Sequence, residues 1–463
     1  MLINSSMIDF CYLISHGFAA RMIIQTDLLG KLARKGFSVG VVTPDTTDKV
    51  LADYCEAANI QLWGYNPKTG RWEGEYLRLR KYLFENVRRN PALREKHLRE
   101  KINSKKSRSF GRIRPYLYLA VHDFLQVAPW IRKIFVRMER QLLKDKKSGE
   151  LLNHISPRWL ISTYPVNLLE GRLLQQANDR KGTKTIIHLL SWDNITCKGR
   201  FPAFADKYIC WGEIMSGELK SYYGVRDEDI AVCGVPHFDL HVEVSKRMSD
   251  AAGSGKKYLF FAMSSPYFAP HEIDIVEWLA SEINKGRWDK LEMIVRPHPQ
   301  NVVGEMADLT WIDRLKAIES DSTKVDWPRL TNSNLKWSMQ KHDMEKLSEL
   351  IASSTISVNS GSTVSIDSLM LAKPVILTMF DADKELPWWK SVKRVIEFPH
   401  IDTLIKTGGL TVVKNYESLT RAIDLYLSDL TYNLEGRKAA IQKECLSTDG
   451  LSTERVVDVL SAL

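Results

Sequence analysis

Polar residues that could do chemistry follow four apolar runs of this sequence. They are Ser15-His16-Gly17, Ser191-Trp192-Asp193-Asn194, Arg296-Pro297-His298-Pro299 and Asn359-Ser360-Gly361-Ser362-Thr363. If the apolar runs are parallel strands, each cluster lies where a strand ends, which is where open α/β sheets bind ligands. The four clusters are therefore the candidate functional residues.

Two clusters carry a candidate general base. His16 precedes a glycine that permits a tight turn, and an imidazole with an ordinary pKa of about 6.5 can accept a proton near neutral pH. Asp193 is the second candidate base, and its neighbours Trp192 and Asn194 suit a hydroxyl-rich ligand through stacking and hydrogen bonds. The alternatives are a structural loop histidine and an Asx turn with the tryptophan in the core.

The other two clusters suit a phosphate. Two prolines fix the imidazole of His298, and Arg296 offers a fork of donors. Residues 360–363 open a predicted helix, whose free N–H groups and hydroxyls form an anion site. Asp367, one turn along, could accept hydrogen bonds from ribose, and Ser264 and Ser265 could add phosphate donors. A structural turn and ordinary N-capping are the alternatives.

Two doubly wound α/β domains would position these clusters. Residues 9–15, 19–35 and 37–43 read as strand, helix and strand, a βαβ unit of a parallel sheet. Further strands are predicted at 159–162, 185–190, 207–211 and 229–233, then at 258–263, 291–295, 355–359, 374–378 and 394–398. A polar connection at 249–257 separates the halves, so we predict domains at 1–245 and 256–435. The helical segment 436–463 could return to the first domain.

A basic insert interrupts the first domain at residues 71–147. It holds 22 Lys and Arg against 8 Asp and Glu, whereas the rest of the chain holds 43 against 48. We predict two or three helices, with breaks at Asn90-Pro91, 104–112, Pro115 and Pro129. Bulky apolar residues mixed with Lys and Arg are compatible with an anionic membrane surface or an acidic acceptor. The alternative is a set of helices packed on the domain with a solvated basic face.

Composition excludes several classes of protein. A chain of 463 residues that is 44% hydrophobic and 26% charged is globular, with two or three domains and room for an enzyme. Its six cysteines are scattered singly, which signals neither a zinc site nor a disulfide framework. No apolar run approaches the roughly 20 residues of a membrane span, and no signal peptide is visible. We therefore expect a cytoplasmic protein.

Nucleic-acid binding is not expected, because the aromatic residues of the insert do not interleave with its charges.

Taken together, the clusters resemble those of the GT-B glycosyltransferases. The segment NSGSTVSIDSLMLAKPVI is similar to their donor-binding segment, which implies that Ser360, Gly361, Ser362 and Thr363 contact phosphate and Asp367 contacts ribose. RPHP with the Ser-Thr segment is similar to the paired HP and Ser-Ser/Thr motifs of bacterial sialyltransferases, capsule Kdo transferases and CDP-glycerol glycerophosphotransferases. This favours a pyrimidine nucleotide. No acidic-acidic-Gly motif precedes the HP, which argues against a sialic acid donor.

The resemblance implies a GT-B fold, with two Rossmann-like domains facing a central cleft, and a metal-independent glycosyltransferase without a cofactor. The enzyme would transfer a sugar from a nucleotide-sugar donor to a hydroxyl of a bacterial surface glycan or lipid-linked glycan, for example of a capsule or cell envelope. His298 and Arg296 would hold the leaving phosphate, and His16, where several inverting relatives place their base, or Asp193 would deprotonate the acceptor. Alternatives are glycerophosphate transfer from CDP-glycerol, 2-epimerisation of a UDP-sugar, and a catalytically silent subunit that binds a glycan or a partner.

Overall fold

The chain folds into two compact units. The computed structural model describes residues 7–67, 70–106, 110–250, 257–302, 308–331, 335, 338–339 and 341–463. The first unit comprises Met1–Val235, Asn332–Ser338 and Thr453–Leu463, and the second comprises Pro236–Thr331 and Met339–Ser452. The break therefore lies before the predicted connection, of which residues 251–256 lie outside the described part.

The first unit is built on a parallel sheet of seven strands, in the order β3-β2-β1-β4-β5-β6-β7. The strands are β1 (Ile8–Leu13), β2 (Val39–Thr43), β3 (Gln61–Gly64), β4 (Pro157–Ser162), β5 (Lys184–His188), β6 (Lys207–Cys210) and β7 (Ile230–Val232). Every residue of β2 is buried, as expected for a strand covered on both faces. The direction of strand addition reverses between β1 and β4, which makes their carboxyl ends the switch point of the sheet.

The second unit contains a parallel sheet of six strands, in the order β10-β9-β8-β13-β14-β15. The strands are β8 (Tyr258–Ala262), β9 (Glu292–Arg296), β10 (Thr323–Val325), β13 (Ile356–Asn359), β14 (Val375–Thr378) and β15 (Thr411–Val413). Short strands β11 (Leu330–Thr331) and β12 (Ser338–Met339) lie outside both large sheets. The predicted class, an α/β protein with two Rossmann-like domains, is confirmed.

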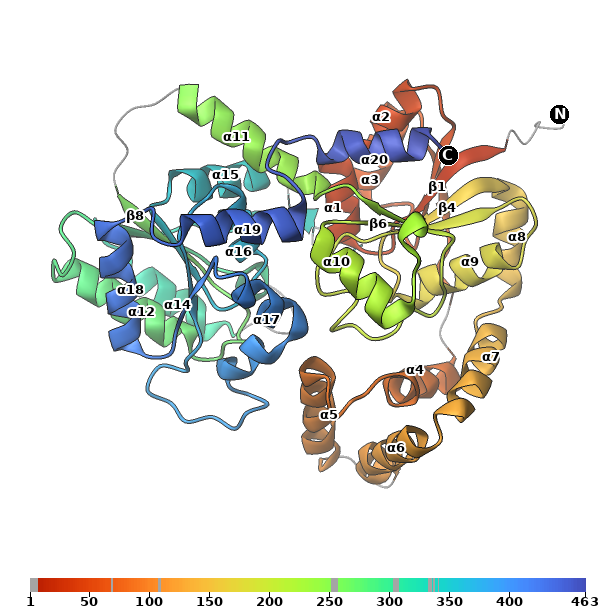
Figure 1. Cartoon of the computed structure of the whole chain (residues 1–463), viewed down its shortest axis with the longest axis horizontal. Coiled ribbons are helices and arrows are strands. Elements are labelled where there is room, and N and C mark those ends of the chain that lie inside the picture. Colours follow the sequence, from red (N-terminus) through yellow and green to blue (C-terminus); the bar gives the residue numbers. More distant parts are fainter. Residues whose placement is uncertain are drawn as a thin grey trace. The chain divides into compact units, whose positions relative to one another are not determined.

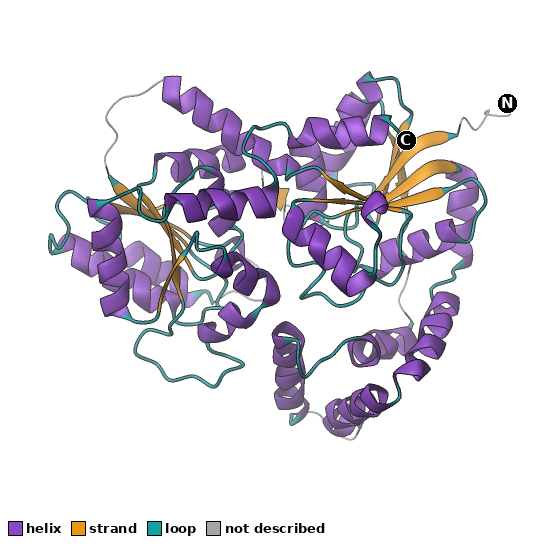
Figure 2. Cartoon of the chain, viewed as in Figure 1, coloured by secondary structure: helices purple, strands orange, loops and turns teal. Residues whose placement is uncertain are grey.

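Helices lie on both faces of each sheet (Figures 1 and 2). In the first unit they are α1 (Gly17–Gln25), α2 (Leu28–Arg34), α3 (Lys49–Ala57), α8 (Lys146–Ile155), α9 (Leu168–Asn178) and α10 (Glu213–Glu218). In the second they are α11 (Asp239–Asp250), α12 (Glu272–Asn284), α13 (Pro299–Val302), α14 (Thr310–Ala317), α15 (Lys341–Ser353), α16 (Val364–Met370), α17 (Pro399–Lys406), α18 (Tyr416–Ser428) and α19 (Leu434–Cys445). Alternate residues of β8 face opposite layers: Leu259 and Phe261 pack with α12, and Phe260 packs with α15.

The predicted strand at 394–398 is wrong. Residues Val392–Glu397 form a 3-10 helix, and β15 is the edge strand instead. The apolar run is buried around the guanidinium of Arg394, which donates hydrogen bonds to the carbonyls of Tyr267, Phe268 and Ser391. A fully buried cation needs these acceptors, and a ladder of strand hydrogen bonds would not supply them.

The basic insert contains more helices than predicted. They are α4 (Arg71–Phe84), α5 (Pro91–Ser104), α6 (Phe110–Val127) and α7 (Arg132–Leu142), with a 3-10 turn at Pro129–Ile131. Asn90 caps α5 by accepting a hydrogen bond from the Leu93 amide at 3.2 Å, and Pro91 begins that helix. Pro115 lies inside α6 and does not break it. Residues 107–109 of the predicted break at 104–112 lie outside the described residues.

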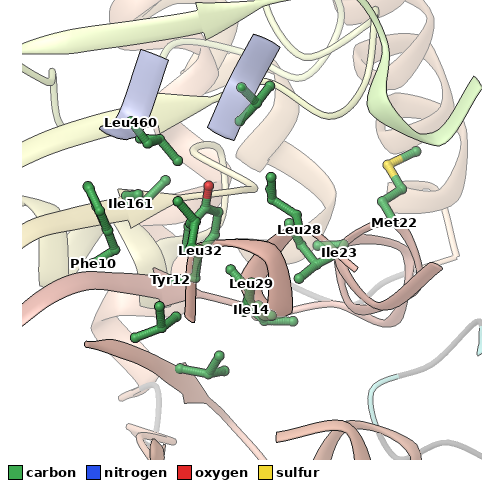
Figure 3. Close-up of a cluster of buried hydrophobic side chains, with 14 of the residues drawn as sticks. Phe10, Tyr12, Ile14, Met22, Ile23, Leu28, Leu29, Leu32, Ile161 and Leu460 are labelled. Atoms are coloured by element: carbon green, nitrogen blue, oxygen red, sulfur yellow. The ribbon is translucent and has the colours of Figure 1, made fainter. Parts of the chain in front are cut away.

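The last helix, α20 (Ser452–Ser461), packs into the core of the first unit. Its side chains Val456, Val457 and Leu460 are fully buried among residues of β1, α1 and α2 (Figure 3). All six cysteines are buried and free. Among the described helices, none is long and apolar enough to cross a membrane.

Truncation of Leu460 tests this packing. Leu460→Ala is expected to lower the free energy of unfolding of the first unit by about 2–5 kcal/mol, because it leaves a cavity in a closed core. Urea denaturation followed by circular dichroism measures the change. Leu451, which is 52% exposed, provides the control, since Leu451→Ala should change it by less than about 0.5 kcal/mol. Equal losses in the two variants would contradict the packing of α20.

Candidate functional site

A buried glutamate organises the carboxyl edge of the first sheet. Glu170, in the first turn of α9, accepts hydrogen bonds from the amides of Thr163 and Tyr164 at 2.9 and 2.7 Å and from the Ser162 hydroxyl at 2.6 Å. It also accepts from the amide and the hydroxyl of Ser15. Burial raises the pKa of Glu170, and these hydrogen bonds oppose the rise. Glu170 therefore joins the loops after β1 and β4, on the two sides of the switch point.

The loop held by Glu170 places His16 at the end of β1, as the N-cap of α1. Its Nδ1 accepts a hydrogen bond from the Phe18 amide at 3.2 Å, and the Gly17 amide donates to the Leu335 carbonyl at 2.7 Å. A neutral imidazole whose Nδ1 accepts a hydrogen bond carries its proton on Nε2. In this conformation His16 is a helix cap, and Nε2 cannot take a proton from an acceptor.

Asp193 lies in the loop after β5. Its carboxylate accepts a hydrogen bond from the Ser191 hydroxyl at 2.8 Å and forms an ion pair with Lys198 at 2.8 Å. Trp192 is only 5% exposed, which leaves little of its ring for stacking on a sugar. Asn194 is buried, and neither atom of its side-chain amide has a hydrogen-bond partner among the described residues. A buried amide in that state is suited to a polar ligand or an ordered water.

Helix α5 of the basic insert holds the same loop. The Asn90 side-chain amide donates to the Thr196 carbonyl at 2.7 Å, and the Lys96 ammonium donates to the Cys197 carbonyl at 2.9 Å. Burial, and then the charge of Lys198, lower the pKa of Lys96. The insert thus contributes a cation to the carboxyl edge of the first sheet, beside the candidate base Asp193.

In the second unit, Arg296 and His298 follow β9. The Arg296 guanidinium is buried and forms ion pairs with Asp326 and Asp343, so its donors are already engaged by two carboxylates. His298 accepts a hydrogen bond at Nδ1 from the Gln300 amide at 3.1 Å, and burial lowers its pKa to about 4. At neutral pH, His298 is therefore uncharged and carries its proton on Nε2.

The turn after β13 is held by its own asparagine. Asn359 Oδ1 accepts hydrogen bonds from the amides of Gly361 and Ser362 at 2.9 and 3.0 Å. The sequence led us to expect these amides to be free for a phosphate, but in the structure they are engaged. Gly361 has a φ of 82°, and a Cβ there would lie 2.7 Å from Val395, so no other residue fits. The Ser360 hydroxyl pairs with that of Thr378 at 2.8 Å.

Asp367 is also engaged. Its carboxylate contacts Nε2 of His241 at 2.6 Å, and Nδ1 of the same imidazole contacts the Ser348 hydroxyl at 2.7 Å. All three side chains are buried, and the Ser348 hydroxyl is also within hydrogen-bond distance of the Met344 carbonyl, at 3.0 Å. The imidazole of His241 therefore bridges Ser348 of α15 and Asp367 of α16. His241 thereby fixes the residue that the sequence resemblance assigns to ribose.

The strongest sign of a ligand site is a set of buried polar atoms at the carboxyl edge of the second sheet. Within the described part of the chain, five such atoms have no hydrogen-bond partner: Ser265 Oγ, Glu272 Oε1, Gln300 Oε1, Asn301 Oδ1 and Asn359 Nδ2. The residues follow β8, β9 and β13, which are neighbours in the sheet, or begin the helix after β8. Because buried polar atoms are nearly always paired, this edge is suited to a polar ligand.

Glu272 stands out in this set because its second oxygen, Oε2, accepts a hydrogen bond from the Ser264 amide at 2.6 Å. Burial raises its pKa to about 8, although the Ser360 hydroxyl and the Ser264 amide oppose the rise. At neutral pH the carboxyl group is therefore protonated, and it can donate a hydrogen bond to an anion. Sequence reasoning missed Glu272, Glu170 and His241. No sequence motif marks them, although Ser264 lies only eight residues before Glu272; Ser15 and both partners of His241 are more than 100 residues away from the side chains that they contact.

No protein-family model matches this sequence, and no curated protein matches it. Solved structures do match. MnaA from S. aureus, solved with UDP, is 10% identical with a TM-score of 0.53 over 98% of this chain and 96% of that chain. The UDP-GlcNAc 2-epimerase from Neisseria meningitidis, solved with UDP-GlcNAc, is 12% identical with a TM-score of 0.52 over 99% of this chain and 100% of that chain. MurG from Acinetobacter baumannii is 9% identical over 98% of this chain and 100% of that chain, with a lower TM-score of 0.47.

The first two matches show the fold, which consists of two Rossmann-like α/β domains of the GT-B type. At 10 and 12% identity they show the fold alone. Glycosyltransferases and UDP-GlcNAc 2-epimerases both occur among the matches. The finer resemblance to capsule Kdo transferases, sialyltransferases and CDP-glycerol glycerophosphotransferases stays a prediction, as do the individual site residues.

The protonated state of Glu272 can be tested through stability. Its pKa rises from 4.5 to about 8 on folding, so between these values the folded protein holds a proton that the unfolded chain has released. The free energy of unfolding must then fall as the pH rises through this window, by at most about 1.4 kcal/mol per pH unit. Glu272→Gln removes this dependence, so wild type should lose stability relative to the variant between about pH 5.5 and about pH 8.5.

Urea denaturation of both proteins across that range gives the measurement. Burial also raises the pKa of Glu444, to about 7, but this residue is present in both proteins and cancels in the difference. A constant difference across the range would show that Glu272 is not protonated in the folded state.

Proposed function

We propose that this protein is a glycosyltransferase that uses a nucleotide-activated sugar, with a pyrimidine nucleotide favoured. The observation that carries the proposal is the set of unpartnered buried polar atoms at the carboxyl edge of the second sheet, headed by Glu272. Five such atoms of several chemical kinds fit a ligand that is rich in oxygen and nitrogen. Nucleotide sugars are ligands of this kind, and enzymes that use them occur on the same fold.

In the donor site, His298 donates a hydrogen bond from Nε2 to the leaving phosphate. It does so as a neutral imidazole, since its pKa is lowered to about 4. Arg296 acts as a positioning residue, because Asp326 and Asp343 already bind its guanidinium. A fixed donor of this kind stabilises charge that develops on the leaving group, and the proposal invokes no metal.

The remaining predicted donor residues surround this group in the proposal. The hydroxyls of Ser264, Ser265, Ser360, Ser362 and Thr363 contact the phosphates, Gly361 allows the turn to approach them closely, and Asp367 contacts the ribose. The Ser265 hydroxyl has no partner among the residues described, which leaves it available to a phosphate oxygen. Asp367 keeps its orientation through His241.

In the acceptor site, Asp193 is favoured over His16 as the general base. The Phe18 amide donates to Nδ1 of His16 and engages it as a helix cap, whereas the carboxylate of Asp193 has further acceptor lone pairs beside those that bind Ser191 and Lys198. Asn194 offers an unpartnered amide next to it, and Trp192 supports the loop from the core. The acceptor is proposed to be a hydroxyl of a bacterial surface glycan or lipid-linked glycan.

The second candidate function is 2-epimerisation of a UDP-sugar, which the fold match to the Neisseria epimerase favours. The observation that favours transfer is the second polar site, at Asn194 and Asp193, because an epimerase has no acceptor to bind. CDP-glycerol as the donor and a catalytically silent subunit are further alternatives. Incubation with UDP-, CDP- and CMP-linked donors, with and without a glycan acceptor, distinguishes the four functions. The mass of the product tells sugar transfer, epimerisation and glycerophosphate transfer apart, and a silent subunit forms no product. An isomerised UDP-sugar formed without acceptor would overturn the proposal.

Removal of the His298 imidazole tests the donor site. We expect His298→Ala to lower kcat about 100-fold or more, since one fixed donor to a developing charge contributes about that much. Stopped assays with the active donor give the rate. His342→Ala is the control, because His342 lies in the same unit and its side chain is 74% exposed.

Because His298 is neutral above about pH 4, its titration should not appear in the pH profile of the wild type near neutrality. Full activity of His298→Ala would remove it from the mechanism.

Removal of the Asp193 charge tests the acceptor site. Asp193→Asn should lower kcat by about 10²–10⁴-fold, the usual contribution of a general base, with little change in donor binding. His16→Ala should lose less. Asp179→Asn is the matched control, because Asp179 is also an ion-paired aspartate of the first unit, with Lys144 as its partner. If His16→Ala lost more activity than Asp193→Asn, the base would have to be reassigned to His16.

A further inference from the structure

Helix α6 of the basic insert exposes a stripe of large apolar side chains. Phe110, Ile113, Leu117, Phe124 and Val127 are between 46 and 86% exposed. Their spacing of three, four and seven residues places them on one side of the helix. Large apolar side chains that gather on one face of a helix mark an interaction surface, whereas scattered ones do not.

A second row of exposed apolar side chains lies in the turn after α6 and along α7. Trp130, Ile134, Met138 and Leu142 follow one another at intervals of four residues and are between 51 and 65% exposed. We call these nine residues of α6, of the turn and of α7 the α6–α7 face. They make up nearly half of the large apolar side chains that are exposed in the described part of the chain.

The helices that carry the α6–α7 face also carry exposed positive charges. Arg112, Lys133, Arg137 and Arg140 are exposed, and among the described residues no carboxylate pairs with any of them. These four cations are therefore available to an anionic partner.

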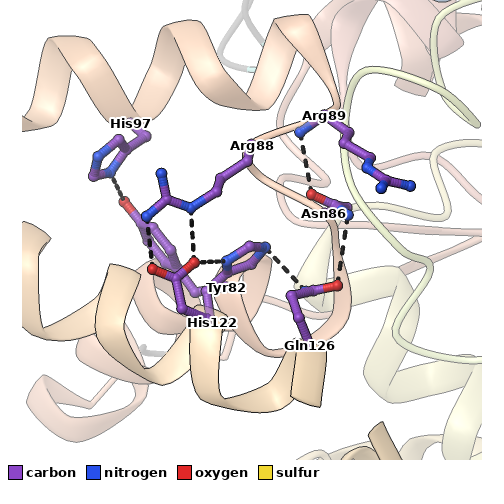
Figure 4. A network of polar contacts seen from close by, with 8 residues as sticks. Tyr82, Asn86, Arg88, Arg89, His97, His122 and Gln126 are labelled. Atoms are coloured by element: carbon purple, nitrogen blue, oxygen red, sulfur yellow. Dashed lines mark hydrogen bonds and ion pairs between the residues drawn. The ribbon is translucent and has the colours of Figure 1, made fainter.

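The acidic residues of the same helices do not offset these cations. Between Phe110 and Leu142 the acidic residues are Asp123 and Glu139. Arg88, which follows α4, binds both oxygens of Asp123 at 2.7 and 2.6 Å (Figure 4), and holds the pKa of that carboxyl well below its usual range. Glu139 is buried against Arg80 of α4. The surface of α6 and α7 is therefore apolar and positively charged.

We propose that the α6–α7 face binds the surface of an anionic lipid bilayer. An amphipathic helix with Lys and Arg beside an apolar stripe lies in the interface between lipid headgroups and acyl chains, where both kinds of side chain are satisfied. A second copy of this chain fits less well, because self-association would bring together two inserts that each hold 22 Lys and Arg against 8 Asp and Glu. A nucleic acid would pair with the cations and leave the apolar stripe in water.

Membrane docking would bring the acceptor site close to lipid. Helix α5 of the same insert holds the loop that carries Asp193, through Asn90 and Lys96. An acceptor attached to a lipid would then arrive at the side of the first unit that faces the bilayer. This consequence rests on the proposed function, whereas the docking itself does not.

Flotation of the full chain with vesicles tests the docking. The protein should float with vesicles of phosphatidylcholine and phosphatidylglycerol, remain unbound with phosphatidylcholine alone, and bind more weakly at high salt. The triple variant Phe124→Ser, Ile134→Ser and Met138→Ser should bind anionic vesicles at least about 100-fold more weakly than wild type. Each of the three side chains loses the favourable transfer of its apolar surface from water.

A charge variant separates the two contributions. Replacement of Arg112, Lys133, Arg137 and Arg140 by Gln should weaken binding to anionic vesicles on the order of 100-fold at low salt and leave little salt dependence. The control for the triple variant is the double variant Tyr222→Ser and Leu309→Ser. Both residues are apolar, lie outside the insert and are 60 and 63% exposed, so this control should bind like wild type.

Three outcomes would overturn the docking. The first is equal binding of wild type and the triple variant to anionic vesicles. The second is a dimer in size-exclusion chromatography that the triple variant abolishes, without vesicle binding by wild type. The third is binding to DNA without binding to vesicles. If wild type shows no transferase activity in any assay, it can still float with anionic vesicles. Failure of the proposed function and failure of the docking are therefore distinguishable.

Discussion

The burial of a glutamate at the carboxyl edge of each sheet is the constraint on which the rest of each unit depends. Glu170 and Glu272 both accept an amide hydrogen bond from the loop after the first strand of their sheet, at Ser15 and Ser264. A desolvated carboxyl group must be satisfied by hydrogen bonds or become neutral. Glu170 takes the first course, with five hydrogen bonds. Glu272 takes the second, with one oxygen unpartnered. The loops after β1 and β4 are thus tied together by the protein, whereas the edge around Glu272 keeps a buried oxygen without a partner among the described residues.

The same constraint explains why residues with the chemistry of a ligand site are held by the protein itself. Arg296 is bound by two aspartates, and Asp367 is bound by His241. A charged side chain at a buried strand end would destabilise the fold without such a partner, because an unpaired buried charge costs several kcal/mol. The partners also fix the orientation of these side chains. A motif read from the sequence therefore locates the edge of the sheet correctly, but it does not separate the groups that touch a ligand from those that position them.

The sequence was sufficient to predict two parallel sheets and most of their strands, but it missed the edge strands β10 and β15 and the partners of the buried polar residues. Buried parallel strands appear as short apolar runs, so strands such as β2 and β8 could be located. The run at 394–398 looked the same, but its burial depends on carbonyls near Tyr267, far away in the chain. Glu170 lies three residues after Asn167, the spacing of a capping box, which would assign it a local role. Its actual partners follow β1 and β4, and no local pattern reports them.

The structure shows which positive charges of the basic insert are paired and which are not. The sequence places its excess of Lys and Arg in one segment but does not say which charges remain free. In the structure, Arg80 pairs with the buried Glu139, Arg88 pairs with Asp123 in an ion pair that stays exposed, and Lys96 donates to a carbonyl of the loop that carries Asp193. These three cations are engaged by partners within the first unit. Arg112, Lys133, Arg137 and Arg140 have no such partner among the described residues, and they are the cations left to meet a surface of opposite charge.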